Sequence, residues 1–177
     1  MKLEKDMIDK SIGSEKTVEC PLEDTFGMMG GHVTIGVSSI IGTRSSQQDA
    51  FYASQNEDGA FAIVCDGMGG LNGGELASGV AVEYLKDRII HDQIPEDVSR
   101  YLMELATAAD LKVSQLTDDE DRAIDGGTTL VLVLVKNGEL HWVSVGDSKI
   151  YLMRDMTVQP LTNEHNYAFM AKSRQDD

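Results

Sequence analysis

The spacing of apolar residues along the chain predicts a sheet protein with one inserted pair of helices. Apolar or alternating runs typical of strands occur at residues 33–38, 50–54, 60–65, 130–135, 140–145, 146–154 and 157–161. Apolar residues three and four apart predict an amphipathic helix at about 74–90 and a second one, opened by Pro95, at 95–116. Two helices of similar length indicate an antiparallel pair that lies on the sheet.

Turn signals connect the strands in antiparallel order. Asp58-Gly59 predicts one hairpin and Asn137-Gly138 a second one of type I′, and a further turn is expected near Asp155. The first hairpin joins 50–54 to 60–65, so it would place Asp49 and Asp66 near one end of the same sheet.

The strand predicted at 130–135 is apolar along its whole length, and the strand predicted at 140–145 is also too apolar to face water. Antiparallel sheets often leave one face in water, and such strands then alternate apolar and polar residues. Continuous apolar strands therefore predict cover on both faces, by helices on one side and by another sheet on the other.

Composition and charge narrow the range of partners. The 177 residues, 41% of them hydrophobic, suit one domain with a sizeable core. Thirty acidic against 15 basic residues give a net charge of −15, which repels nucleic acids and anionic membranes. We expect neither partner, and a site that handles phosphate should need metal ions to reverse the local field.

Cysteine use and apolar segments indicate a cytoplasmic protein. Cys20 and Cys65 form no disulfide framework, and Cys65 ends an apolar run as a small buried residue would. No apolar segment reaches 18 residues, and residues 1–10 lack the apolar core of a signal peptide.

The stretch from Phe61 to Gly74 has the most distinctive pattern in the chain. An apolar run ends at Asp66, and five glycines follow within eight residues. One interpretation is a tight turn with an exposed aspartate, since Asp-Gly is a common turn dipeptide. The other is a strand that carries a carboxylate into a loop whose bare backbone can approach an ion or an anionic substrate.

Three separate segments carry an aspartate where a strand or loop ends: Asp49, Asp66 and Asp147. Carboxylate and carbonyl oxygens suit Mg²⁺ and Mn²⁺, whereas the four histidines show no spacing typical of zinc ligands. The acidic run 118–121 is interpreted as a solvated loop. No nucleotide-binding glycine motif is present, and no Cys-x5-Arg loop follows Cys65, so hydrolysis would use a metal-bound water.

Five motifs in order resemble those of the metal-dependent serine/threonine phosphatases of type 2C, in their bacterial subgroup. They span about residues 32–166 and read Arg44-Ser-Ser-Gln-Gln-Asp49-Ala, Val64-Cys-Asp66-Gly-Met-Gly-Gly70, Gly126-Gly-Thr-Thr129, Val145-Gly-Asp147-Ser and Leu161-Thr-Asn-Glu-His165. The resemblance implies an α+β fold, a four-layer α-β-β-α sandwich of two antiparallel sheets flanked by helix pairs. It also implies hydrolysis of phosphoserine and phosphothreonine in proteins at a centre of two Mn²⁺ or Mg²⁺ ions.

The resemblance assigns roles position by position. Asp66 resembles the carboxylate that bridges the two ions, and Gly67 the backbone carbonyl ligand. Asp49 resembles the acidic residue of the first motif, and Asp147 a ligand of a third, weaker ion. Arg44 resembles the guanidinium that holds the substrate phosphate, a role that its planar fork suits, although an arginine without the motif is more often a surface residue.

Several positions depart from the family pattern. Gln48 stands where animal members have a metal-binding glutamate, Lys149 where arginine is usual, and Met68 where many animal members have histidine, so no general acid is assigned there. Family domains are longer than this chain, which ends before two further metal-binding aspartates. We therefore expect an extension at 1–30 and, at 31–177, a phosphatase domain whose C-terminal part is missing.

Two functions remain open at this point. The first is the phosphatase activity itself, with phosphoproteins as substrates and a cognate Ser/Thr kinase as a partner. The alternative is a regulatory or interaction module, or an inactive fragment, that keeps the fold. With one helix pair for two sheets, we expect an uncovered sheet that self-associates, borrows cover from a partner or from the extension, or folds poorly.

Overall fold

The computed structural model describes residues 18–19, 33–43, 46–56, 59–70, 73–118 and 120–163. Its elements in chain order are β1 (Val18–Glu19), β2 (Gly36–Val37), β3 (Asp49–Asn56), β4 (Gly59–Gly69), α1 (Gly73–His91), α2 (Val98–Ser114), β5 (Gly126–Thr128), β6 (Leu130–Lys136), β7 (Glu139–Val145), β8 (Tyr151–Arg154) and β9 (Thr157–Pro160). The described elements thus include the two helices and the strands that the apolar spacing predicts.

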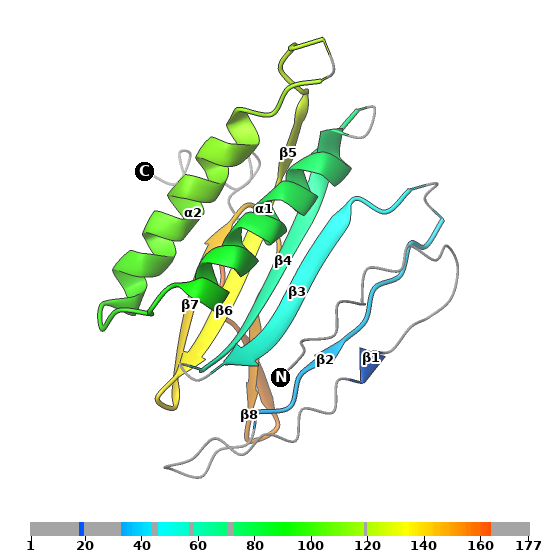
Figure 1. The fold of residues 1–177 in the computed structure, drawn as a ribbon. Coiled ribbons are helices and arrows are strands. Elements are labelled where there is room, and N and C mark those ends of the chain that lie inside the picture. The colour runs from blue at the N-terminus through cyan, green and yellow to red at the C-terminus, as the bar shows by residue number, and fades with distance from the viewer. Residues whose placement is uncertain are drawn as a thin grey trace, which may run out of the picture.

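The main sheet has the strand order β3-β4-β6-β7, and β5 pairs with the end of β4. Every pairing in it is antiparallel. Two smaller antiparallel pairs stand beside it, β1 with β2 and β8 with β9. Figure 1 shows α1 and α2 lying next to each other across one face of the main sheet. The predicted combination of antiparallel sheets with a flanking helix pair is confirmed.

The turns predicted at Asn137-Gly138 and near Asp155 are also confirmed, whereas Asp58 of the turn predicted at Asp58-Gly59 lies outside the described residues. The β6–β7 turn has φ of 54° at Asn137 and 79° at Gly138. Positive φ at both central residues identifies a type I′ turn. Asp155 and Met156 turn from β8 to β9 with φ of 50° and 61°. In the β3–β4 hairpin Asp49 is paired directly with Asp66, so the two aspartates lie side by side at one end of the sheet.

Strand β4 is longer than the sequence pattern predicts. The apolar run ends at Asp66, but the strand continues to Gly69 because Gly67–Gly69 pair with Gly126–Thr128 of β5. The prediction that the strand ends at Asp66 is therefore wrong. Backbone pairing extends the strand where no apolar side chain marks it, and Asp66 lies within β4.

The core lies between the helices and one face of the main sheet. The helices contribute buried residues at three- and four-residue spacing, and β4 and β6 contribute alternate residues. Its most deeply buried large side chains are Ile63, Leu85, Ile89, Leu102, Leu132 and Leu134. Each large aliphatic side chain buried there contributes about 1.5–3 kcal/mol. At the start of α2, the Asp97 carboxylate accepts a hydrogen bond from the Arg100 amide at 3.1 Å and caps the helix.

The opposite side of the main sheet, here called the open face, is only partly covered. Phe51, Val64 and Trp142 are 40%, 43% and 42% exposed there, although neighbouring Val131 is 8% exposed. The cover predicted on both faces of 130–135 fits the buried β6, but it is wrong for 140–145, because no described element seals the edge strand β7 on this side.

Some predictions fall outside the described residues. They include the boundary expected near residue 31 and the position of Arg44. Within the predicted extension the structure describes only β1, which pairs with β2. Neither described helix is long and apolar enough to span a membrane.

Candidate functional site

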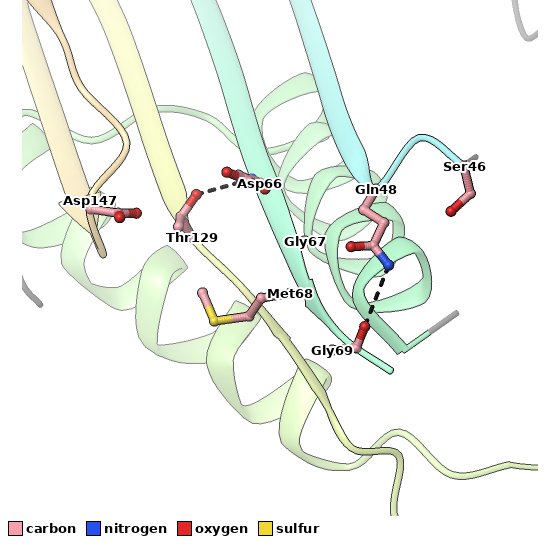
Figure 2. A pocket seen from close by; sticks show the side chains of 8 residues that line it. All are labelled: Ser46, Gln48, Asp66, Gly67, Met68, Gly69, Thr129 and Asp147. Carbon is pink, nitrogen blue, oxygen red and sulfur yellow. Dashed lines mark hydrogen bonds between the residues drawn. The ribbon is translucent and has the colours of Figure 1, made fainter. Parts of the chain in front are cut away.

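A pocket of about 570 Å³ opens at the end of the main sheet where β3 begins. Figure 2 shows the side chains around it, which come from the segment before β3, the second half of β4, the β5–β6 junction and the connection after β7. The lining residues are Ser46, Gln48, Asp66, Gly67, Met68, Gly69, Thr129 and Asp147. The pocket therefore gathers four of the five motifs that the sequence singles out.

Hydrogen bonds with the β5–β6 junction hold the backbone of Asp66 in place. Its amide donates a hydrogen bond to the Thr129 hydroxyl at 3.0 Å, drawn in Figure 2. Its carbonyl accepts from the Thr129 amide at 2.9 Å and from the Thr128 hydroxyl at 3.1 Å. With both backbone groups bonded, the exposed Asp66 residue borders the pocket from a fixed position.

Gly67 is packed between two backbone segments. Its amide donates to the Gln48 carbonyl at 3.1 Å, and the same carbonyl accepts from the Ser78 hydroxyl of α1 at 2.6 Å. A Cβ on Gly67 would lie 2.1 Å from the Gly74 carbonyl oxygen and 2.5 Å from that of Gln48. Only glycine allows the start of α1 and the segment before β3 to approach β4 this closely.

The structure brings together three of the predicted site residues and places a fourth beside them. Asp66, Gly67 and Asp147 line the pocket. Asp49 is paired directly with Asp66, and side chains of directly paired residues lie on the same face of a sheet. Asp49 is not among the lining residues, however, and Arg44 lies outside the described residues.

Two of the lining residues, Ser46 and Thr129, carry hydroxyl groups to which the sequence analysis gave no role. Thr129 is 2% exposed and contacts both Asp66 and Ser148, whose hydroxyl is 2.6 Å from its own. The sequence did place Thr129 in the motif that runs from Gly126 to Thr129. Membership of a motif does not show, however, which neighbouring strand the hydroxyl contacts.

The charged donors of the pocket are hard oxygens, and the Met68 thioether lines it as well. Two carboxylates and the backbone of Gly67 border the same space, which suits Mg²⁺ or Mn²⁺ better than softer metals. Among the residues that the structure describes, no three His, Cys, Asp or Glu side chains form a group that could hold an ion by themselves. Mg²⁺ usually keeps several waters and takes only one or two protein carboxylates, so this partial donor set fits such an ion.

Cys65 lies next to Asp66 in the sequence but faces the core. It is 0% exposed, and burial raises the pKa of its thiol to about 12, an effect that a hydrogen bond with Thr128 only partly opposes. The thiol is protonated at neutral pH and is no nucleophile there, since only the thiolate attacks. This agrees with the absence of a cysteine phosphatase loop in the sequence.

Comparison with known proteins places these motifs in a family. The profile of the Protein phosphatase 2C family matches residues 38–173. Serine/threonine phosphatase stp of Listeria welshimeri is 28% identical over 127 residues, which are 70% of this chain and 50% of that protein. Protein phosphatase PhpP of Streptococcus pneumoniae is 32% identical over 127 residues, with 70% of this chain and 51% of that protein covered. The chain thus spans about half the length of the relatives it matches.

A solved structure shows the same fold. The catalytic domain of the serine/threonine protein phosphatase PstP, in complex with two manganese ions, superimposes with a TM-score of 0.58 at 26% identity. The alignment covers 76% of this chain and 56% of that one. This likeness confirms the predicted fold class of antiparallel sheets flanked by helices, and the described residues supply one helix pair of the predicted α-β-β-α sandwich. The motifs that meet at the pocket, the family profile and the shared fold agree, and the chain belongs to the Protein phosphatase 2C family.

Proposed function

We propose that this chain forms the Asp66 side of a metal-dependent active site that hydrolyses phosphoserine and phosphothreonine in proteins. The observation that carries the proposal is the pocket in which Asp66, Gly67 and Asp147 meet. Family membership and the phosphatase names of the relatives support the reaction class. Because the chain covers about half of those relatives, the activity of the whole protein is part of the proposal.

The residues present fit Mn²⁺ or Mg²⁺ by their donor chemistry. Asp66 would hold two ions, with the Gly67 carbonyl and Asp49 beside it, and Asp147 would hold a third, weaker one. The manganese ions in the PstP structure support this choice of metal. When bound, such ions supply a water of lowered pKa and neutralise charge on the transferred phosphoryl group.

The chain's own residues would bind and orient the reactants. The hydrogen bonds to Thr129 and Thr128 hold the Asp66 backbone, so the carboxylate stands on a fixed segment of β4. Gln48 leaves the pocket without a further negative charge, and its amide lies within 3.5 Å of the Gly69 carbonyl. Arg44 would hold the substrate phosphate through two parallel hydrogen bonds.

The finer predictions belong to this proposal as well. We place the protein in the cytoplasm, with phosphoproteins as substrates and a cognate Ser/Thr kinase as its counterpart, and with residues 31–177 as part of a phosphatase domain after an extension at 1–30. The net charge of −15 supports a protein substrate over a nucleic acid.

A phosphatase assay with added Mn²⁺ tests the proposal. The chain would be compared with Asp66→Asn and with a matched control, Asp110→Asn, which removes an exposed carboxylate on α2. We expect Asp66→Asn to abolish turnover of a phosphopeptide and Asp110→Asn to preserve it. Equal activity in both variants would show that Asp66 has no part in the reaction.

A chimaera that adds the C-terminal half of a relative separates the remaining alternatives. Activity only in the chimaera, again lost with Asp66→Asn, supports an inactive fragment that retains a competent half-site. No activity in either form, with the fold intact by circular dichroism, supports the regulatory or interaction module.

A further inference from the structure

The hydrogen-bond ladder between β4 and its neighbour changes at one position beside the pocket. Val64 pairs with Val131 and Gly67 with Thr128, so the same register sets Asp66 opposite Thr129. The Thr129 amide donates to the Asp66 carbonyl at 2.9 Å, as a ladder requires. The return bond differs, because the Asp66 amide donates at 3.0 Å to the Thr129 hydroxyl instead of the Thr129 carbonyl.

The displaced Thr129 carbonyl shares a donor with the Asp66 carbonyl. The Thr128 hydroxyl lies 3.0 Å from the Thr129 carbonyl, and the same hydroxyl lies 3.1 Å from the Asp66 carbonyl. Two neighbouring hydroxyls therefore replace one ordinary ladder bond at the position of the central carboxylate. An apolar side chain at position 129 would leave the Asp66 amide without this acceptor.

The side chain of Thr129 also reaches the loop that carries Asp147. Its hydroxyl is 2.6 Å from the hydroxyl of Ser148. Its methyl group faces Gly146, where an added Cβ would lie 2.8 Å from it. Gly146 has a φ of 97°, which favours glycine, so the chain turns here in close contact with Thr129.

Burial makes these contacts strong. Thr129 is one of two buried polar or charged residues among those described, at 2% exposure, so water does not compete for its hydroxyl. The Thr129 hydroxyl bonds both Asp66 and Ser148, so it links strand β4 to the loop between β7 and β8. These two segments carry Asp66 and Asp147, the two carboxylates that line the pocket.

We propose that Thr129 is a positioning residue whose hydroxyl sets the placement of Asp66 relative to Asp147. The expected consequence is a pocket preorganised for a divalent ion, and this part of the proposal rests on the proposed function. Groups that orient the ligands of a metal typically affect its affinity by about 10–100-fold when removed. Ser148 is the second half of the same link.

The test uses the full chain and separates the hydroxyl of Thr129 from its methyl group. Thr129→Val keeps the volume and removes the hydroxyl, whereas Thr129→Ser keeps the hydroxyl and removes the methyl group. Isothermal titration with Mn²⁺ should show an affinity loss of about 10–100-fold for Thr129→Val, with most of the affinity kept in Thr129→Ser. Ser148→Ala should weaken binding too, and it should add little in the Thr129→Val background because the two residues share one interaction.

A second readout needs no metal. Amide hydrogen exchange measured by NMR should be faster at Asp66 in Thr129→Val than in the wild-type chain, and the resonances of Asp147 and Ser148 should shift. Thr129→Ser should show neither change. Thr107→Val is the matched control, because it removes an exposed hydroxyl on α2 that bonds the Met103 carbonyl at 2.9 Å, and it should alter neither readout.

The outcomes distinguish this proposal from the proposed function. A wild-type chain that binds no Mn²⁺ counts against the metal site, and amide exchange alone then decides the role of Thr129. Unchanged exchange at Asp66 and unshifted Asp147 and Ser148 resonances in Thr129→Val would overturn the positioning role. A larger effect of Thr129→Ser than of Thr129→Val, in either readout, would also overturn it, because packing of the methyl group would then be the cause.

Discussion

Replacing Gly67 by alanine should destabilise the protein strongly, because the strand at the pocket has no room for a single methyl group. The added Cβ would lie 2.1 Å from the Gly74 carbonyl oxygen and 2.5 Å from the Gln48 carbonyl oxygen. Both obstacles are backbone atoms, so neither can rotate away as a side chain would. The methyl group can be accommodated only if α1 or the segment before β3 moves away from β4.

The size of the effect follows from what such a movement breaks. Overpacking in a close-packed interior typically costs about 1–3 kcal/mol. The Gly67 amide also donates to Gln48 at 3.1 Å, and a net hydrogen bond contributes about 0.5–1.5 kcal/mol. We therefore expect the free energy of unfolding to fall by about 2–4 kcal/mol, which for a chain of this length lowers Tm by about 5–15 °C.

Urea unfolding, followed by circular dichroism and by the fluorescence of the single tryptophan Trp142, measures this change. Gly70→Ala is the matched control, since a Cβ there meets nothing within 4 Å. Gly79→Ala is a control of opposite sign, because it too meets nothing and lies inside α1, where alanine is favoured by about 0.5–1 kcal/mol. A Gly67→Ala chain as stable as the Gly70→Ala chain would refute the close approach of α1 to β4.

Two further predictions concern the buried thiol and the open face. In a Cys20→Ser background the Cys65 thiol should not react with a thiol reagent at pH 8 until the chain is unfolded, and rapid reaction in the folded state would contradict its burial. Because folding raises its pKa from 9.0 to about 12, the thiol stabilises the fold fully below about pH 9, and this contribution is lost as the pH rises toward 12. For the open face, light scattering should show association that increases up to about 0.1 M salt, as the charge of −15 is screened, and that decreases in Trp142→Gln. A monomer that binds no hydrophobic dye at any salt concentration would contradict this second prediction.

Much of the fold could be predicted because its signals are local. The helices α1 and α2 follow from apolar residues three and four apart, and the turns at Asn137-Gly138 and Asp155 follow from residues that accept positive φ. The pairing of Asp49 with Asp66 is local as well, since one short hairpin sets it. The strand β5 was missed because Gly126–Thr128 carries no apolar pattern, and its pairing is made by backbone groups alone.

The part of the site that the sequence could not predict depends on a long-range register. Asp66 and Thr129 are 63 positions apart, and α1 and α2 lie between them in the chain. A shift of β6 by one residue along β4 would turn the hydroxyl of Thr129 to the other face of the sheet. The apolar residues of β6 oppose that shift only weakly. Val131 and Leu132 are both buried although they lie on opposite faces of the sheet, so the shifted strand would still place an aliphatic side chain on each face. The hydroxyl of Thr129, which bonds the Asp66 amide in place of a ladder carbonyl, is itself specific to one register, so the polar contact at the pocket also helps to select the pairing of the two central strands.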